Sequence, residues 1–137
     1  MRRFLAHFLF LLAAWTVLIK YLFPVAYALA YDEPLGSHVF LDLWPLAHVL
    51  VGWSLLHWQR WTFGLAAAVS IAEIAIVSGK FVVFLHAPEW TIWRTNWFVN
   101  KIFVLGCFVM LLTWLLANAR QLRSAGPAPD AGARVQA

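Results

Sequence analysis

Four long runs of apolar residues limit this chain to one broad class of fold. Each run has about 20 residues or more, the length a helix needs to cross a bilayer, and the runs cover residues 4–30, 39–58, 61–85 and 97–119. Charged residues make up only 12% of the chain, whereas a soluble domain carries about 25%. We therefore predict an all-α fold, a polytopic transmembrane bundle of four helices in one domain over residues 1–123. Residues 124–137 are rich in Ala, Pro and Gly, and we expect a disordered cytoplasmic tail there.

Basic residues in the connections predict which way the bundle faces. Lys and Arg favour the cytoplasmic flanks of membrane spans, and four crossings would put most of them on one side: Arg2, Arg3, Arg60, Arg120 and Arg123. The other side would hold Asp32, Glu33 and Glu89, with Arg94 as its basic residue. We expect both termini in the cytoplasm and a multi-pass protein of the bacterial inner membrane. The net charge of +4 is explained by these flanks, so no nucleic-acid partner is expected.

An alternative topology begins with a cleaved secretory signal. Arg2 and Arg3, an apolar run and the small residues Ala28 and Ala30 resemble such a signal and its cleavage site. Cleavage would leave three spans. Two features argue against it, because the apolar run exceeds the usual length of about 7–15 residues and Lys20 interrupts it.

Two features predict how the helices pack. Gln59 and Arg60 form a connection too short for anything but a tight hairpin, so the second and third spans should be antiparallel neighbours. The third span carries small residues at steps of three and four, which share one helical face: Gly64, Ala68, Ala72, Ala75 and Gly79. Small residues allow close helix approach in lipid, so we expect this face at the bundle centre. Pro24 and Pro45 should kink their spans, because proline removes a backbone donor.

A carboxylate near the middle of the third apolar run indicates an internal polar site. Placing Glu73 there costs roughly 2.5–3.5 kcal/mol on insertion scales, and ionisable residues at such depth are usually paired or functional. From the helical rise, Glu73 lies about 18 Å from the outer end of its span, with His48 at about 13 Å and Lys20 at about 15 Å. We predict that Glu73 contacts Lys20 or His48. Glu73 and His48 are also the candidate catalytic residues.

A second group of polar residues lies within roughly 8 Å of the outer ends of the spans: Asp42, Lys80, Asn100 and Lys101. Together with Lys20, Arg94 and Asn96, this group supplies the candidate lipid- or ligand-binding residues. One carboxylate between two ammonium groups favours an anionic group, such as a lipid phosphate. The alternative is that Lys80 and Lys101 extend separately to the headgroups.

The order of these polar residues carries a family resemblance. Residues 42–52, with an acid and His48 on one span, Glu73 on the next, and residues 94–100 before Gly106 resemble the VanZ-like membrane proteins and related uncharacterised small bacterial membrane proteins. An Asp often follows the Asn in that family, whereas Lys101 follows Asn100 here. The resemblance implies a role at the cell envelope, where the VanZ branch is linked to glycopeptide resistance.

Three classes of function follow from these expectations. The first is a non-enzymatic accessory or envelope-associated subunit, whose buried polar site binds a lipid headgroup or docks on a larger membrane complex. The alternative is an intramembrane enzyme acting on a lipid or isoprenoid, and the third is a proton or ion pathway. No metal or cofactor is expected, because no paired-histidine spacing appears and His57 does not match His48 in depth for a haem. Cys107 is the single cysteine, so no intrachain disulfide can form.

Overall fold

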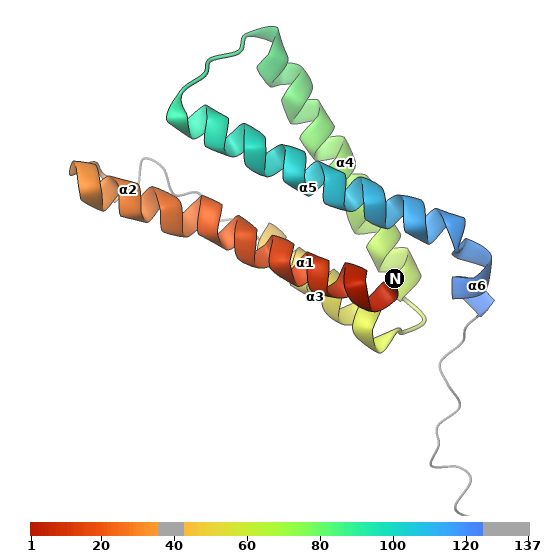
Figure 1. The fold of residues 1–137 in the computed structure, drawn as a ribbon. Helices are drawn as coiled ribbons and strands as arrows, with labels where there is room; N and C mark the ends of the chain where they lie inside the picture. The colour runs from red at the N-terminus through yellow and green to blue at the C-terminus, as the bar shows by residue number, and fades with distance from the viewer. Residues whose placement is uncertain (36–42, 125–137) are drawn as a thin grey trace, which may run out of the picture.

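The computed structural model describes residues 1–35 and 43–124, and every regular element in these ranges is a helix (Figure 1). The elements follow in chain order as α1 (Arg2–Val17), the π-helix η1 (Leu18–Leu22), α2 (Phe23–Tyr31), α3 (Trp44–His57), α4 (Thr62–His86), α5 (Ile92–Ala117) and α6 (Ala119–Ser124). The all-α prediction is confirmed for these residues. Asp42, the start of the predicted second span and residues 125–137 of the predicted tail lie outside the described part.

One turn of π-helix joins α1 to α2 within a continuous helical rod (Figure 1). Pro24 has no backbone N–H, so it cannot donate to the carbonyl of Lys20, four residues earlier. The chain widens instead, and the N–H of Phe23 donates to the carbonyl of Leu18, five residues earlier. Lys20 therefore lies in the middle of a π turn, an irregularity that is frequent at functional sites.

Pro45 has a different place from the one expected. It is the second residue of α3, where the missing N–H costs nothing because first-turn N–H groups have no intrahelical acceptor. The prediction that Pro45 kinks a span is therefore wrong, and this proline starts the helix. With 14 residues, α3 is about 21 Å long at the usual rise, shorter than a hydrocarbon core of about 30 Å.

Three helices in the described ranges are long and apolar enough to cross a membrane. They are the rod Arg2–Tyr31, α4 and α5. The described part of α3 does not reach that length. The tight hairpin expected between the second and third apolar runs is confirmed, since α3 ends at His57 and α4 begins at Thr62. Its turn is closed by the N–H of Gln59, which donates to the Thr62 hydroxyl at 2.8 Å.

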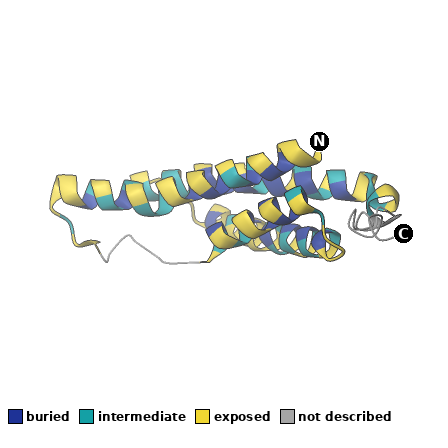
Figure 2. Cartoon of the chain, turned by 90° about the horizontal axis from the view of Figure 1, so that it is seen from below, coloured by how far each residue is buried: buried dark blue, intermediate teal, exposed yellow. Residues whose placement is uncertain are grey.

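The helices associate as two pairs, α1 with α3 and α4 with α5 (Figure 1). The first pair is especially close at Gly52 of α3, where an added Cβ would lie 3.0 Å from the carbonyl oxygen of Ala6. Figure 2 shows buried residues on the sides that the helices turn towards one another and exposed residues on the outer sides. The core between the pairs is aliphatic and aromatic, with Leu5, Leu9, Leu12, Val51, Leu55, Val104, Phe108 and Leu111.

The small-residue face of α4 does not lie at the centre of the bundle. Gly64, Ala68, Ala75 and Gly79 are exposed, and an added Cβ at either glycine would meet nothing within 4 Å. The buried face consists of Thr62, Ala66, Ser70, Glu73, Val77 and Phe84. The packing prediction for the small residues is therefore wrong. Turning Glu73 inward avoids placing a carboxylate in lipid, and the same rotation carries the small residues outward.

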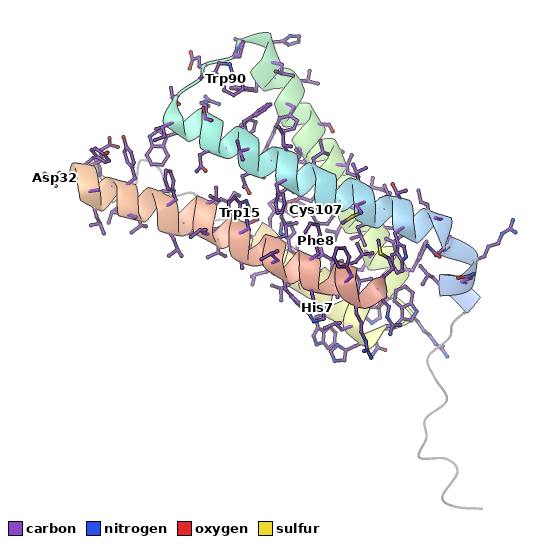
Figure 3. The ribbon with its side chains drawn as sticks, in the orientation of Figure 1. His7, Phe8, Trp15, Asp32, Trp90 and Cys107 are labelled. Carbon is purple, nitrogen blue, oxygen red and sulfur yellow. The ribbon has the colours of Figure 1, made fainter. Side chains whose placement is uncertain are left out.

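The two ends of the molecule differ in charge. The Arg2 guanidinium lies 5.8 Å from the centre of the Trp58 ring, so the start of α1 and the α3–α4 turn share one end, where α6 also lies (Figure 1). We call this the basic end, with Arg2, Arg3, Arg60 and Arg120. The opposite end carries Asp32, labelled in Figure 3, and the α4–α5 loop with Glu89. We call it the acidic end.

Candidate functional site

A histidine and a glutamate from adjacent helices meet inside the bundle. His48 Nε2 of α3 lies 3.1 Å from Glu73 Oε1 of α4, and the two side chains are only 1% and 2% exposed. The predicted contact between Glu73 and His48 is therefore present. The His48 ring also packs on Phe108 of α5, with 5.2 Å between ring centres. The other ring nitrogen of His48, Nδ1, is buried and has no hydrogen-bond partner among the described residues.

Three lysines from three elements lie within electrostatic range of one another, and we call them the lysine cluster: Lys20, Lys80 and Lys101. Lys20 of η1 interacts electrostatically with the other two and with Glu73. Lys101 of α5 interacts with Glu73 and with Lys80. Lys101 is only 5% exposed, so it does not extend independently to the surface, whereas Lys80 is exposed. The sequence placed Lys20 in the deeper polar group and Lys80 and Lys101 in the shallower one. In the structure the three lysines interact with one another, so the two groups are adjacent.

Polar side chains of α5 face the rod near its π turn. Asn96 Nδ2 lies 3.5 Å from the carbonyl oxygen of Ile19, which is part of that turn. Asn100 is one helical turn further along α5 and buried, and its Oδ1 has no partner within the described ranges. Thr16 of α1 is also buried, with Oγ1 likewise unpartnered there. Sequence reasoning missed Thr16, although its spacing of four from Lys20 places both on one helical face.

A groove opens between α4 and α5 at the acidic end, where the two helices diverge towards their loop (Figure 1). We call it the α4–α5 groove. It has a volume of about 540 Å³, and its lining includes two cationic residues, two aromatic ones and two small ones: Lys80, Arg94, Phe84, Trp97, Ala75 and Gly79. Lys80 thus belongs both to the lysine cluster and to the groove. Neither His48 nor Glu73 lines it.

Aromatic residues fill the space between the diverging helix ends. Trp90 in the loop, labelled in Figure 3, lies 5.1 Å from the ring of Phe84 and 5.1 Å from that of Phe98. Trp97 packs on Phe84 at 5.5 Å between ring centres. Phe84 and Trp97 also line the groove, so these aromatic contacts support its wall near the α4–α5 loop. The sequence did not indicate that Trp97 lines a groove.

The arrangement defines a class of protein. Apolar helices long enough to cross a bilayer enclose a buried polar pair, as in a multi-pass membrane protein. Comparison of the chain with protein-family models, with curated proteins and with solved structures gives no match in any of the three. The resemblance to VanZ-like proteins therefore stays a prediction from the polar residues. Among the described residues, no three His, Cys, Asp or Glu side chains are grouped to hold a metal ion.

Proposed function

We propose that this protein is a non-enzymatic, envelope-associated membrane protein that binds an anionic lipid headgroup at the lysine cluster and the adjoining groove. The observation that carries the proposal is the α4–α5 groove, which Lys80 and Arg94 line beside the lysine cluster. Like charges held together away from water are costly unless an anion compensates them. The phosphate of a lipid is the anion most available at the headgroup level, where Lys80 lies.

The proposed topology places this site at a membrane surface. The rod ends at the acidic end with Asp32, while α3 ends at the basic end beside Arg2. The chain must therefore return between residues 32 and 57, and α3 supplies about 21 Å of the roughly 30 Å required. We propose that this return is a fourth crossing. The basic end then lies in the cytoplasm of a bacterial inner membrane, and the groove faces the outer leaflet.

The apolar outer surface of the bundle is consistent with an accessory role in the membrane. Large apolar side chains are exposed on every long helix, for example Leu11, Leu50, Ile71 and Val109, as lipid or the helices of a larger membrane complex require. The VanZ-like order of polar residues supports a role at the cell envelope. Binding of a lipid headgroup is the part of this proposal that the site geometry supports directly.

The His48–Glu73 pair favours a second candidate, an intramembrane enzyme acting on a lipid or isoprenoid. A carboxylate that orients an imidazole and leaves its other nitrogen basic is a general-base arrangement. Both side chains are almost fully buried and neither lines the groove, so a ligand in the groove would not touch them. Binding is therefore the better-supported function. Release of phosphate or of a chain alcohol from a bound lipid, lost in His48→Gln, would favour the enzyme instead.

Lipid binding by purified protein tests the proposal. The full chain in mild detergent is titrated with phosphatidylglycerol and with zwitterionic phosphatidylcholine of the same chains, and bound lipid is counted by native mass spectrometry. We expect retention of phosphatidylglycerol only, and at least a tenfold loss in the double variant Lys80→Gln/Arg94→Gln. Arg60→Gln removes an exposed cation at the basic end and should change nothing. Equal retention by the wild type and the double variant would reject the site.

A further inference from the structure

We infer that the occupant of the α4–α5 groove is a lipid phosphate monoester, with its phosphate between Lys80 and Arg94 and its hydrocarbon chain across Ala75 and Gly79. This inference rests on the proposed function and names the ligand class for the same site. It separates lipids with a terminal phosphate from the phosphodiesters that make up most anionic phospholipid.

Charge is the first argument. A phosphate monoester carries about −1.5 to −2 near neutral pH, whereas a phosphodiester carries one negative charge. Lys80 and Arg94 both line the groove, and Lys20 and Lys101 lie within electrostatic range of Lys80. The only described carboxylate in this group, Glu73, is already bonded to His48. The two cations that line the groove, Lys80 and Arg94, match a dianion better than a monoanion.

The chemistry of the groove mouth points to phosphate oxygens. Arg94 can present two parallel N–H donors to a phosphate, while Lys80 acts as a compact charge. Arg94 also lies in the first turn of α5, where the helix dipole favours an anion. Among the described residues no carboxylate lines the groove, and Glu89 in the preceding loop is exposed and does not contribute to it.

The size and depth of the groove require a hydrocarbon chain as well. At about 30 Å³ per water, a volume of 540 Å³ is far larger than a phosphate group needs. From the helical rise, Lys80 lies about 9 Å from the end of α4 and Ala75 about 17 Å, so the groove passes from headgroup depth into the hydrocarbon. Gly79 has no side chain and open space beside it, which lets a chain lie against the helix.

A comparison of headgroups on identical chains tests the ligand class. Dioleoyl phosphatidate, dioleoyl phosphatidylglycerol and inorganic phosphate are titrated against the full chain in mild detergent. We expect phosphatidate to bind about fivefold more tightly than phosphatidylglycerol, as one added charge near a cationic surface provides. Equal binding of the two lipids would overturn the monoester inference and leave the proposed function standing. Binding of neither lipid would reject both.

Inorganic phosphate separates a lipid site from a site for the free ion. We expect millimolar phosphate to displace little phosphatidate, because it cannot fill the apolar part of the groove. Full displacement at concentrations comparable to that of the lipid would overturn the lipid assignment.

Two glycines on the same exposed face of α4 test the position of the chain. Gly79→Leu fills the groove, whereas Gly64→Leu adds the same side chain outside it, and both sites have open space around the new Cβ. We expect thermal stability at or above that of the wild type in both variants, because leucine favours a helix more than glycine does, with at least tenfold weaker phosphatidate binding in Gly79→Leu only. Wild-type binding by Gly79→Leu, or equal losses in the two variants, would show that the chain lies elsewhere.

Discussion

His48 Nε2 and Glu73 Oε1 lie 3.1 Å apart at a point where α3 and α4 are both turned away from solvent. The two residues are 25 positions apart in the chain, and each lies on the buried face of its helix. Glu73 turns the polar side of α4 inward, and His48 provides the partner that makes a buried carboxylate tolerable.

The pair should be energetically coupled. Removing one partner of a buried ionic or hydrogen-bonded pair costs about 3–5 kcal/mol, so Glu73→Ala and His48→Ala should each lower the melting temperature in detergent. The double variant should lose less than the sum, by about 0.5–3 kcal/mol, because one contact is lost in each case. Strictly additive losses would mean that the 3.1 Å contact contributes no stability.

Glu73 should also balance the lysine cluster. Glu73→Gln keeps a hydrogen-bond acceptor for His48 but removes the carboxylate that attracts Lys20 and Lys101. We expect lower thermal stability, and partial recovery when Lys101→Gln is added, because a buried positive charge is removed. A further loss in Glu73→Gln/Lys101→Gln would contradict this charge balance.

Two glycine-to-alanine substitutions should have opposite signs. Helix propensity favours alanine over glycine by about 1 kcal/mol, and Gly106→Ala should show this gain because a Cβ there meets nothing within 4 Å. At Gly52 the new methyl would lie 3.0 Å from the Ala6 carbonyl oxygen. That oxygen belongs to the backbone and cannot rotate away, so Gly52→Ala should destabilise by about 1–3 kcal/mol. Melting temperatures of the two variants in detergent decide the matter.

Labelling of single cysteines in intact cells tests the proposed topology. In a Cys107→Ser background, Glu89→Cys and Glu33→Cys should react with an impermeant maleimide, and Arg60→Cys should react only after permeabilisation. The physical reason is the position of Arg60 at the basic end and of the two glutamates at the acidic end. Reaction of Glu33→Cys and Glu89→Cys from different sides would contradict the proposed four crossings.

The mature protein should retain its first helix. Leu5, Leu9 and Leu12 of α1 are fully buried in the core, and Gly52 is shaped to fit against Ala6. Cleavage after Ala30 would remove these contacts and expose the apolar face of α3. Intact-mass measurement of protein purified from membranes should therefore include residues 2–30, and a mature terminus at Tyr31 would refute this prediction.

The sequence predicted the helices better than their orientations. Apolar runs locate α4 and α5 within a few residues, and the short connection at Gln59 requires a hairpin. The contact between Glu73 and His48 could be predicted because the helical rise converts residue number into depth, and the two residues have similar depths. The same arithmetic cannot say which face of a helix turns inward. For α4 the small residues were expected at the centre together with Glu73, and only Glu73 is buried there.

The groove could not be predicted because it depends on the divergence of two helices. Lys80 and Arg94 are 14 positions apart in the chain. They line one groove because α4 and α5 diverge towards the loop that joins them and leave a space between their ends. Aromatic packing around Phe84 and Trp97 supports that separation. Pro45 shows a similar limit, since a proline in an apolar run indicates a kink or a helix start equally well.

The rod from α1 through α2 makes this molecule sensitive to bilayer thickness. Its 30 residues extend about 45 Å, and matching this length to a hydrocarbon core of about 30 Å by tilt alone would exceed the usual range of up to about 40°. The end of α2 should therefore emerge among the headgroups, where Tyr27 packs on Trp93 of α5 with 4.6 Å between ring centres. A thicker membrane would cover this contact with acyl chains. Hydrophobic mismatch thus gives the protein a preference among membranes that its polar site alone would not provide.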